Sequence, residues 1–216
     1  MRCKMRKIRF LAILAIGLLC LCFSFVACEP NNGNGNQNGG NITTEGNVLI
    51  AYFSRTGENY SVGVIDKGNT EIIAEIIAEQ TGGELFEIQR ITPYPDNYEE
   101  VKDEAEQEKR ENARPELLES KNISDYDIIF IGYPIWHGDM PMPLYTFIEA
   151  NDWTGKTVIP FCTHEGSGLS GTMSTIRTKC AGATVLDGLA VRGATAQNST
   201  QSAKTQVLSW LDKLGF

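Results

Sequence analysis

The chain has 216 residues, and its 27 Asp and Glu outnumber its 19 Lys and Arg, which gives a formal net charge of −8 at pH 7. This acidity argues against a protein that binds nucleic acid or anionic lipid through a basic surface, because such partners are polyanions. The two histidines and six cysteines show neither metal-ligand nor C-x-x-C spacing, which argues against a zinc site and a thiol redox centre. The length suits one globular domain.

Residues 1–27 have the layout of an export signal, because five basic residues precede the apolar run Phe10–Ala27. Cys28 follows a small residue, and this arrangement resembles the signal of bacterial lipoproteins, although Phe25 replaces the usual leucine. The resemblance implies lipidation at Cys28, which becomes the new N-terminus. The alternative is a permanent membrane helix, since 18 apolar residues can just span a bilayer. Both interpretations place the rest of the chain outside the cytoplasmic membrane.

A tether of low sequence complexity follows, over residues 28–46. It is dominated by Asn and Gly and has one apolar side chain after the cysteine, Ile42. Such a composition cannot bury enough surface to offset the entropy of the chain, so we expect disorder. A coil of this length would hold the domain about 25 Å from the membrane.

From Asn47 onward, strand and helix patterns alternate. Val48–Phe53 is an apolar run typical of a buried strand, and Ile72–Ile77 carry apolar side chains on one helical face before Gly82-Gly83 ends the helix. Asp96–Ala113 is charged and predicts a helix whose face is solvated, with partner docking as the alternative. The other predicted strands are Glu84–Gln89, Asp127–Tyr133, Thr157–Thr163 and one within Thr184–Val191; the other predicted helices begin at Pro141 and contain Leu169–Cys180 and Ala203–Leu214.

Five strands alternating with helices predict an α/β fold with a doubly wound, five-stranded parallel sheet. Trp153 and Trp210 are expected in its core. Cys162 and Cys180 should be free thiols, because a helix of about 11 residues separates them by about 16 Å, beyond the reach of a disulfide. In such folds ligands bind at the carboxyl ends of the strands, so the loops there are the candidate site.

The loop after the first strand contains Ser54-Arg55-Thr56-Gly57, and Gly68-Asn69-Thr70 leads into the following helix. Backbone N–H groups of a first helical turn, with nearby hydroxyls, can hold a phosphate. The alternative is an ordinary turn with Asn69 or Thr70 as the cap. The stretch is neither a Walker loop nor a dinucleotide fingerprint.

The loops after the third and fourth strands are also distinctive. Trp136 lies in a loop framed by Pro134 and Pro141, which favours an aromatic platform over a packed core side chain. Thr163–Gly168 is small and hydroxylated, so its backbone can approach a planar ligand closely. The two histidines lie in these loops and could move a proton, or could simply be surface imidazoles; Glu165 could act similarly or cap the turn.

These three loops, SRTG…GNT, GYPxW-x-G-x-x-P and FCTHEGSG, together resemble the flavodoxin family over residues 47–216. The resemblance implies the strand order 2-1-3-4-5, the cofactor FMN and no catalytic residue of the protein itself. The cofactor-binding positions that it implies are Ser54, Arg55, Thr56, Gly57, Asn69 and Thr70 for the phosphate, Pro134, Ile135, Trp136 and His137 along the isoalloxazine, and Thr163, His164, Glu165, Gly166, Ser167 and Gly168 at the pyrimidine edge.

Two departures from short-chain flavodoxins bear on function. Glu58–Lys67 interrupts the phosphate loop and could be a lid or a partner-specific surface. Thr163–Gly168 has no Tyr or Trp, so sandwiching of the ring by two aromatic side chains is not expected and one face could be open to a substrate.

We therefore expect an FMN-binding electron-transfer protein anchored outside the cytoplasmic membrane, serving redox partner proteins or a small redox substrate. The first alternative is an FMN-dependent NAD(P)H or quinone-type oxidoreductase. The second is a flavodoxin-like binding module without flavin.

Overall fold

The computed structural model describes residues 46–216. The predicted signal peptide, the lipidation site Cys28 and the tether up to residue 45 lie outside the described residues and stay predictions. Within the described part of the chain, no helix is long and apolar enough to cross a membrane.

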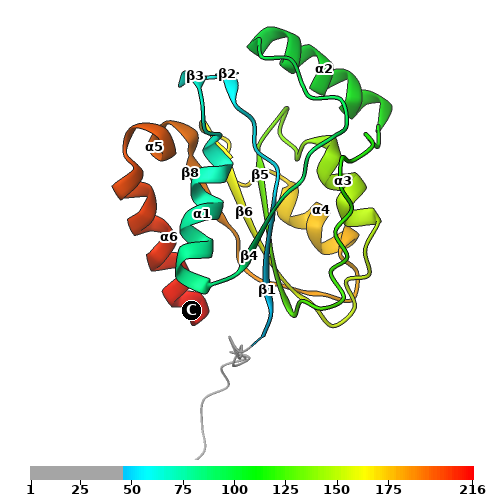
Figure 1. Ribbon diagram of the computed structural model, residues 1–216, viewed down its shortest axis with the longest axis vertical. Helices are drawn as coiled ribbons and strands as arrows, with labels where there is room; N and C mark the ends of the chain where they lie inside the picture. The colour runs from blue at the N-terminus through cyan, green and yellow to red at the C-terminus, as the bar shows by residue number, and fades with distance from the viewer. Residues whose placement is uncertain (1–45) are drawn as a thin grey trace, which may run out of the picture. The chain divides into compact units, whose positions relative to one another are not determined.

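A parallel sheet forms the centre of the described domain (Figure 1). Its strands run in the order β4-β1-β5-β6, and both β7 and β8 pair with the far side of β6. This arrangement confirms the predicted order 2-1-3-4-5, with β7 and β8 as two halves of the fifth strand. The bounds are Val48–Tyr52 for β1, Glu84–Glu87 for β4, Ile128–Pro134 for β5, Thr157–His164 for β6, Thr184–Val185 for β7 and Leu189–Arg192 for β8.

The fifth strand is interrupted opposite Pro160 of β6. Leu186 N–H still donates to the Val158 carbonyl, and pairing resumes at Phe161 with Leu189. Pro160 has no N–H to continue the ladder on this side, so the chain bulges there. The sequence did not predict this interruption.

Helices cover both faces of the sheet, as the apolar strands require. Alternate residues of β1 serve two separate cores: Leu49 and Ala51 pack on the side of α3 and α4, whereas Ile50 and Tyr52 pack on the side of α1 and α6 (Figure 1). The helices of the first side are α3, Met142–Glu149, and α4, Thr172–Lys179; those of the second are α1, Asn69–Thr81, α5, Gly193–Asn198, and α6, Thr200–Leu214.

The expected core residues are where the sequence placed them. Trp153 and Trp210 are buried. Cys162 and Cys180 are buried free thiols, and burial raises the pKa of each to about 12. Both thiols are therefore protonated and unreactive near neutral pH.

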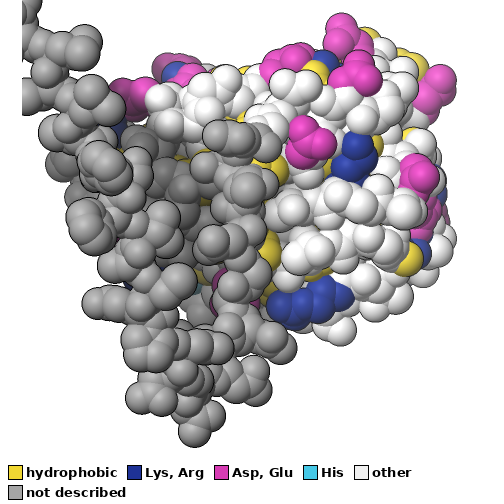
Figure 2. All heavy atoms as spheres, turned by 90° about the horizontal axis from the view of Figure 1, so that it is seen from below, with side chains coloured by type: hydrophobic (Ala, Val, Ile, Leu, Met, Phe, Trp, Pro, Cys, Tyr) yellow, Lys and Arg dark blue, Asp and Glu magenta, His cyan; other side chains and the backbone are white. Residues whose placement is uncertain are grey.

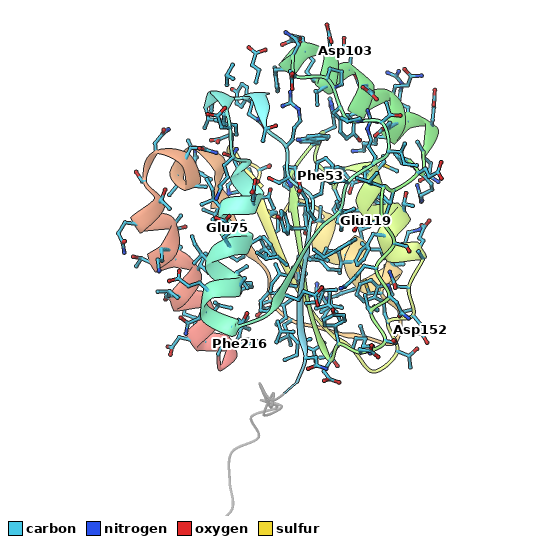
Figure 3. All side chains as sticks on the ribbon, in the orientation of Figure 1. Phe53, Glu75, Asp103, Glu119, Asp152 and Phe216 are labelled. Atoms are coloured by element: carbon cyan, nitrogen blue, oxygen red, sulfur yellow. The ribbon has the colours of Figure 1, made fainter. Side chains whose placement is uncertain are left out.

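Two further elements stand above the carboxyl edge of the sheet (Figure 1). Helix α2, Tyr98–Glu111, confirms the predicted charged helix, and Asp103 lies on its outer side in Figure 3. The segment that interrupts the phosphate loop forms a separate antiparallel hairpin of β2, Gly57–Asn59, and β3, Gly63–Ile65. On the uncovered part of the face shown in Figure 2, Asp and Glu side chains lie mostly along the upper and right edges, with Lys and Arg side chains among and below them.

Candidate functional site

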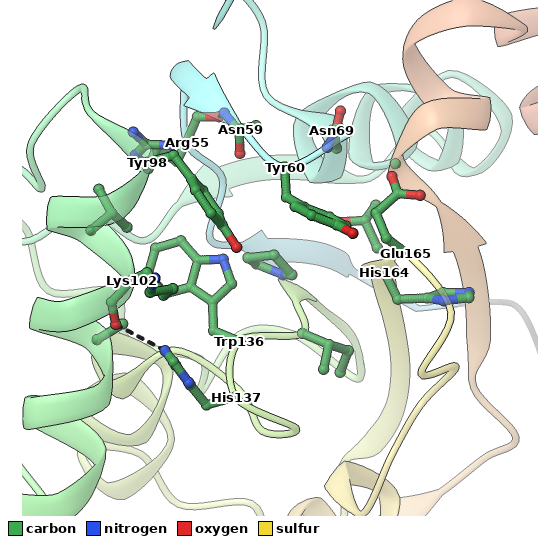
Figure 4. A pocket seen from close by; sticks show the side chains of 16 residues that line it. Arg55, Asn59, Tyr60, Asn69, Tyr98, Lys102, Trp136, His137, His164 and Glu165 are labelled. Atoms are coloured by element: carbon green, nitrogen blue, oxygen red, sulfur yellow. Dashed lines mark hydrogen bonds between the residues drawn. The ribbon is translucent and has the colours of Figure 1, made fainter. Parts of the chain in front are cut away.

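A cavity of about 340 Å³ opens at the carboxyl ends of β5 and β6, between α2 and the N-terminus of α1 (Figure 4). It brings together residues from all three predicted loops. The predicted site residues that line it are Arg55, Asn69, Pro134, Ile135, Trp136, His137, Thr163, His164 and Glu165. Three segments that are distant along the chain thus meet at one cavity.

Seven predicted site residues do not line this cavity. Ser54 and Thr56 line a neighbouring hollow on the β4 side of the first loop, and Thr56 and Gly57 line a third hollow beside the hairpin. The remaining four are Thr70, Gly166, Ser167 and Gly168. The three loops meet at one cavity, but the sequence could not say which side of each loop faces it.

Two hydroxyls that were expected to face an anion have partners within the protein. Ser54 Oγ accepts the N–H of Glu71 at 3.1 Å and so caps α1 from outside the helix. The Thr70 and Thr163 hydroxyls are buried and lie 2.8 Å apart in a mutual hydrogen bond. These contacts fasten the start of α1 to β1 and β6, so both residues position the site.

Trp136 is held by a tight turn. Its backbone exchanges two hydrogen bonds of 2.9 Å with Asp139, while His137 and Gly138 adopt positive φ values of 48° and 75°. The indole packs edge-to-face against Phe53, with ring centroids 5.3 Å apart, and against the ring of Tyr94 at 5.1 Å. These contacts fix the orientation of the Trp136 indole.

The two histidines have positional contacts. His137 Nε2 lies 2.9 Å from the carbonyl of Lys102 (Figure 4), and the His137 carbonyl accepts a hydrogen bond from Lys109. The Trp136 turn is thus tied to α2. These bonds favour a positional role for His137 over proton transfer.

His164 organises the third loop. Its Nδ1 accepts the N–H groups of Gly166 at 2.8 Å and Gly168 at 3.1 Å. Burial lowers the pKa of His164, and the nearby Arg192 lowers it further. The ring is therefore neutral at pH 7, with Nδ1 as the acceptor and the proton on Nε2.

The cavity also contains residues that sequence reasoning missed. They come from the hairpin, from α2 and from the start of α5: Asn59, Tyr60, Tyr98, Val101, Lys102, Ala105 and Gly193. The third loop has no aromatic residue, as noted, but Tyr60 and Tyr98 bring aromatic rings into the cavity from other segments. The sequence features that could have revealed these two rings are a tyrosine in the inserted loop and another at the start of a charged helix.

The family model for flavodoxins matches residues 47–214. The chain belongs to the flavodoxin family. Its structure is similar to a candidate flavoprotein from Bacteroides eggerthii DSM 20697, with 28% identity, a TM-score of 0.63 and coverage of 79% of this chain and 99% of the other. A candidate flavoprotein from Bacteroides uniformis ATCC 8492 shows 31% identity, a TM-score of 0.61 and coverage of 75% and 97%.

A flavoprotein from Lactobacillus acidophilus NCFM, solved in complex with FMN, shares the fold at 24% identity. Its TM-score is 0.53, over 71% of this chain and 97% of the other. No curated protein matches the chain.

The loop after β1 and the start of α1 offer backbone N–H groups that could hold an anion. The N–H groups of Ser54, Arg55, Thr56, Asn69 and Thr70 have no hydrogen-bond acceptor within residues 46–216. A Cβ on the adjoining glycine at position 68 would lie 2.0 Å from an oxygen and 2.9 Å from a nitrogen of this loop, so only glycine allows the two segments to meet. Unpaired amides beside a helix N-terminus favour a bound phosphate.

Asn69 offers a second point of fit. Its Oδ1 is buried and has no hydrogen-bond donor in the described structure, although the residue lines the cavity. An unpaired buried carbonyl costs free energy, so a ligand hydroxyl or N–H would stabilise it. Glu165, which also lines the cavity, accepts the Ala194 N–H at 2.7 Å, so it caps the start of α5 and not its own turn.

Proposed function

We propose that the domain binds FMN non-covalently and transfers electrons through it. The observation that carries this proposal is the set of five unpaired N–H groups on the loop after β1 and at the start of α1; two of their residues, Arg55 and Asn69, line the cavity that also contains the Trp136 indole. A phosphate needs the first feature and a flat heteroaromatic ring needs the second. The Lactobacillus acidophilus flavoprotein, which contains FMN, supports the choice of ligand.

Different residues along the cavity would contact different parts of FMN. The amides of the first loop and of α1 would hold the phosphate, Asn69 Oδ1 would accept from the tail, and Trp136 and Ile135 would contact the ring. FMN supplies one- or two-electron redox chemistry when it is bound. The protein binds and orients it, and the buried aromatic cluster behind Trp136 excludes water from one side.

The acidic charge of the chain supports basic redox partners, which it would attract in a salt-dependent manner. We place the domain outside a bacterial cytoplasmic membrane, held by lipid on Cys28, because an apolar run ends at that cysteine and a polar tether follows.

A second candidate is an FMN-dependent NAD(P)H or quinone-type oxidoreductase. The specific observation in its favour is Tyr60, which lines the cavity and is 61% exposed. An exposed aromatic at the outer end of the cavity suits a small substrate. Steady-state oxidation of NAD(P)H with quinones by the FMN-loaded protein separates this candidate from a carrier, which would show little turnover.

FMN binding is tested on the full chain, purified in detergent. We expect a yellow protein with flavin absorption bands, and FMN removed from it should rebind in calorimetric titration. Trp136→Ala should weaken binding about tenfold through lost ring contact. The matched control, Trp210→Phe, changes a tryptophan of the core on the far side of the sheet and should leave FMN affinity unchanged.

A colourless protein that gives no heat with FMN would contradict the proposal. An unchanged dissociation constant in Trp136→Ala would remove that side chain from the binding site.

A further inference from the structure

The neighbouring hollow on the β4 side of the first loop has a volume of about 480 Å³. Of the residues that line the cavity assigned to FMN, only Arg55 also lines this hollow. We propose that the hollow binds a primary ammonium group on an aliphatic chain, held by Tyr52, Glu71 and Glu87. The inference goes beyond electron transfer and does not depend on FMN.

Carboxylates predominate in the lining of this hollow. None of them forms an ion pair within residues 46–216; they are Asp66, Glu71, Glu87 and Asp96. Arg90 also lines the hollow, but its guanidinium is paired with Glu104 and Glu108 on α2. Arg55 donates to backbone carbonyls of the segment before α2. The unpaired carboxylates therefore favour a bound cation.

Glu71 and Glu87 each have one carboxylate oxygen without a partner. Glu71 Oε2 accepts the Gly68 N–H at 3.2 Å, and Glu87 Oε2 accepts the side-chain amide of Gln89 at 2.7 Å. The Oε1 atom of each glutamate makes no hydrogen bond in the described part of the chain. Burial raises the pKa of the Glu87 carboxyl, and the charge of Glu71 raises it further. A cation beside both groups would offset these unfavourable effects.

Tyr52 distinguishes this hollow from an ordinary acidic surface. The residue is only 6% exposed, yet its hydroxyl makes no hydrogen bond within residues 46–216. Tyr52 is paired with Glu87 in the register of β1 and β4, so both side chains leave the sheet on the side of α1. Burial raises the pKa of the Tyr52 hydroxyl, and Glu87 and Glu71 raise it further, as expected for a phenol directed at these carboxylates. A buried phenol without a partner costs free energy that a ligand would recover.

A primary ammonium group fits these three side chains. It has three N–H donors, and the two free carboxylate oxygens and the phenol oxygen supply three acceptors. Lys67 does not provide this group, because its ammonium is bound to the Glu75 carboxylate at 2.6 and 2.8 Å. Among residues 46–216, no three His, Cys, Asp or Glu side chains are arranged to hold a metal ion, so an organic cation is the better match.

Two exposed apolar side chains of the lining fit the aliphatic part of the ligand. Ile91 and Leu118 are 51% and 56% exposed. Their segments are joined by the bond from the Ile91 N–H to the Glu116 carbonyl and by the bond from the Leu118 N–H to the Gln89 carbonyl. Covering these side chains with methylene groups would add hydrophobic stabilisation. A free alkylamine and a lysine side chain of a peptide both offer this combination of groups.

The test is an NMR titration of the isotope-labelled full chain in detergent at low ionic strength. The probe is pentylammonium, and tetramethylammonium serves as a cation without N–H donors. A second arm uses the peptide acetyl-Leu-Lys-Leu-amide, which presents the same group as a lysine side chain. The variants are Glu87→Gln and Tyr52→Phe. Asp212→Asn, at an exposed position of α6, controls for the loss of one charge, and Tyr126→Phe controls for the loss of one phenol hydroxyl.

We expect pentylammonium to shift the amide signals of Glu71 and Glu87. Its affinity should fall about tenfold in Glu87→Gln, which loses a charged hydrogen bond, and about threefold in Tyr52→Phe, which loses a neutral one. Both control variants should bind it like the unaltered chain. Tighter binding of the peptide would identify a lysine side chain of a partner as the source of the ammonium, and tighter binding of pentylammonium would identify a free amine.

Equal affinity in Glu87→Gln and Asp212→Asn would overturn the inference, because the general acidity of the chain would then attract the amine. An unchanged affinity in Tyr52→Phe would also overturn it, since the phenol would have no part in binding. Tetramethylammonium that binds as tightly as pentylammonium would do the same, because N–H donation would then contribute nothing.

Discussion

Helices α1 and α2 both border the cavity, but they are held in opposite ways. Helix α1 buries an apolar face in which Ile73, Ala74 and Ile77 are fully inaccessible against the sheet. Helix α2 has only Val101 and Ala105 among its buried residues. Hydrophobic burial therefore fixes α1, and with it the phosphate end of the site, while α2 needs other contacts to stay in place.

Those contacts are polar. Arg90, whose side chain is 9% exposed, pairs with Glu104 and Glu108 on α2, and Glu108 also accepts from the Tyr94 hydroxyl. Lys109 donates to the carbonyl of His137 in the Trp136 turn. Directional bonds can be lost without disturbing the core of the sheet. The structure at the outer end of the cavity, beside α2, can therefore change while the end beside α1, where we propose that the phosphate binds, keeps its structure.

The largest predicted effect tests the apolar side of this comparison. Ile73→Ala should lower the free energy of unfolding by about 3 kcal/mol, because it leaves a cavity between α1 and the sheet. Val101→Ala on α2 should lower it by about 1.5 kcal/mol, since it deletes two methyl groups beside an open cavity. Urea unfolding of the full chain in detergent measures both. Equal losses in the two variants would show that α2 is packed as firmly as α1.

A smaller effect is expected from the polar side. Glu108→Gln should lower the free energy of unfolding by about 2 kcal/mol, because it removes the more buried of the two carboxylates that compensate Arg90. The control on α1 is Glu79→Gln, which breaks an exposed ion pair with Lys204 and should cost less than about 1 kcal/mol. If Glu108→Gln cost no more than Glu79→Gln, the inference that polar contacts hold α2 in place would be wrong.

The same contrast explains what the sequence could predict. The periodicity of Val48–Phe53 and Ile72–Ile77 revealed strands and helices because burial on the sheet imposes that periodicity. The three loops were found because each directly follows a strand. Local patterns therefore predicted the strands, the helices and the loops that meet at the cavity, whereas the sheet order came from the resemblance to flavodoxins.

The rest depends on contacts between distant segments. The Arg55 guanidinium reaches the carbonyl of Asp96, 41 residues away, and this bond sets the hairpin beside α2. No local pattern records which way a loop hydroxyl turns, so Ser54 and Thr70 were expected to face a ligand and instead hold α1 in place. The break in the fifth strand similarly depends on Pro160 of its neighbour.

The third loop forms the remaining wall of the cavity. Variants of His164 test whether this loop is held by apolar packing, like α1, or by polar contacts, like α2. His164 keeps this loop in shape through two N–H bonds to its Nδ1, which is a polar attachment like that of α2. His164→Leu should lower the free energy of unfolding by about 1 kcal/mol at pH 8. His164→Asn should lower it much less, because the amide oxygen can replace Nδ1 as the hydrogen-bond acceptor.

The pH dependence of this variant gives a second measurement. Burial lowers the pKa of folded His164 below its ordinary 6.5, so its contribution is present above pH 6.5 and is lost as the pH falls through the folded pKa. A protonated Nδ1 cannot accept either N–H group. The stability difference between the unaltered chain and His164→Leu should therefore shrink from pH 8 to pH 5, and a difference that stays constant over this range would show that the imidazole supports the loop by packing instead of by accepting hydrogen bonds.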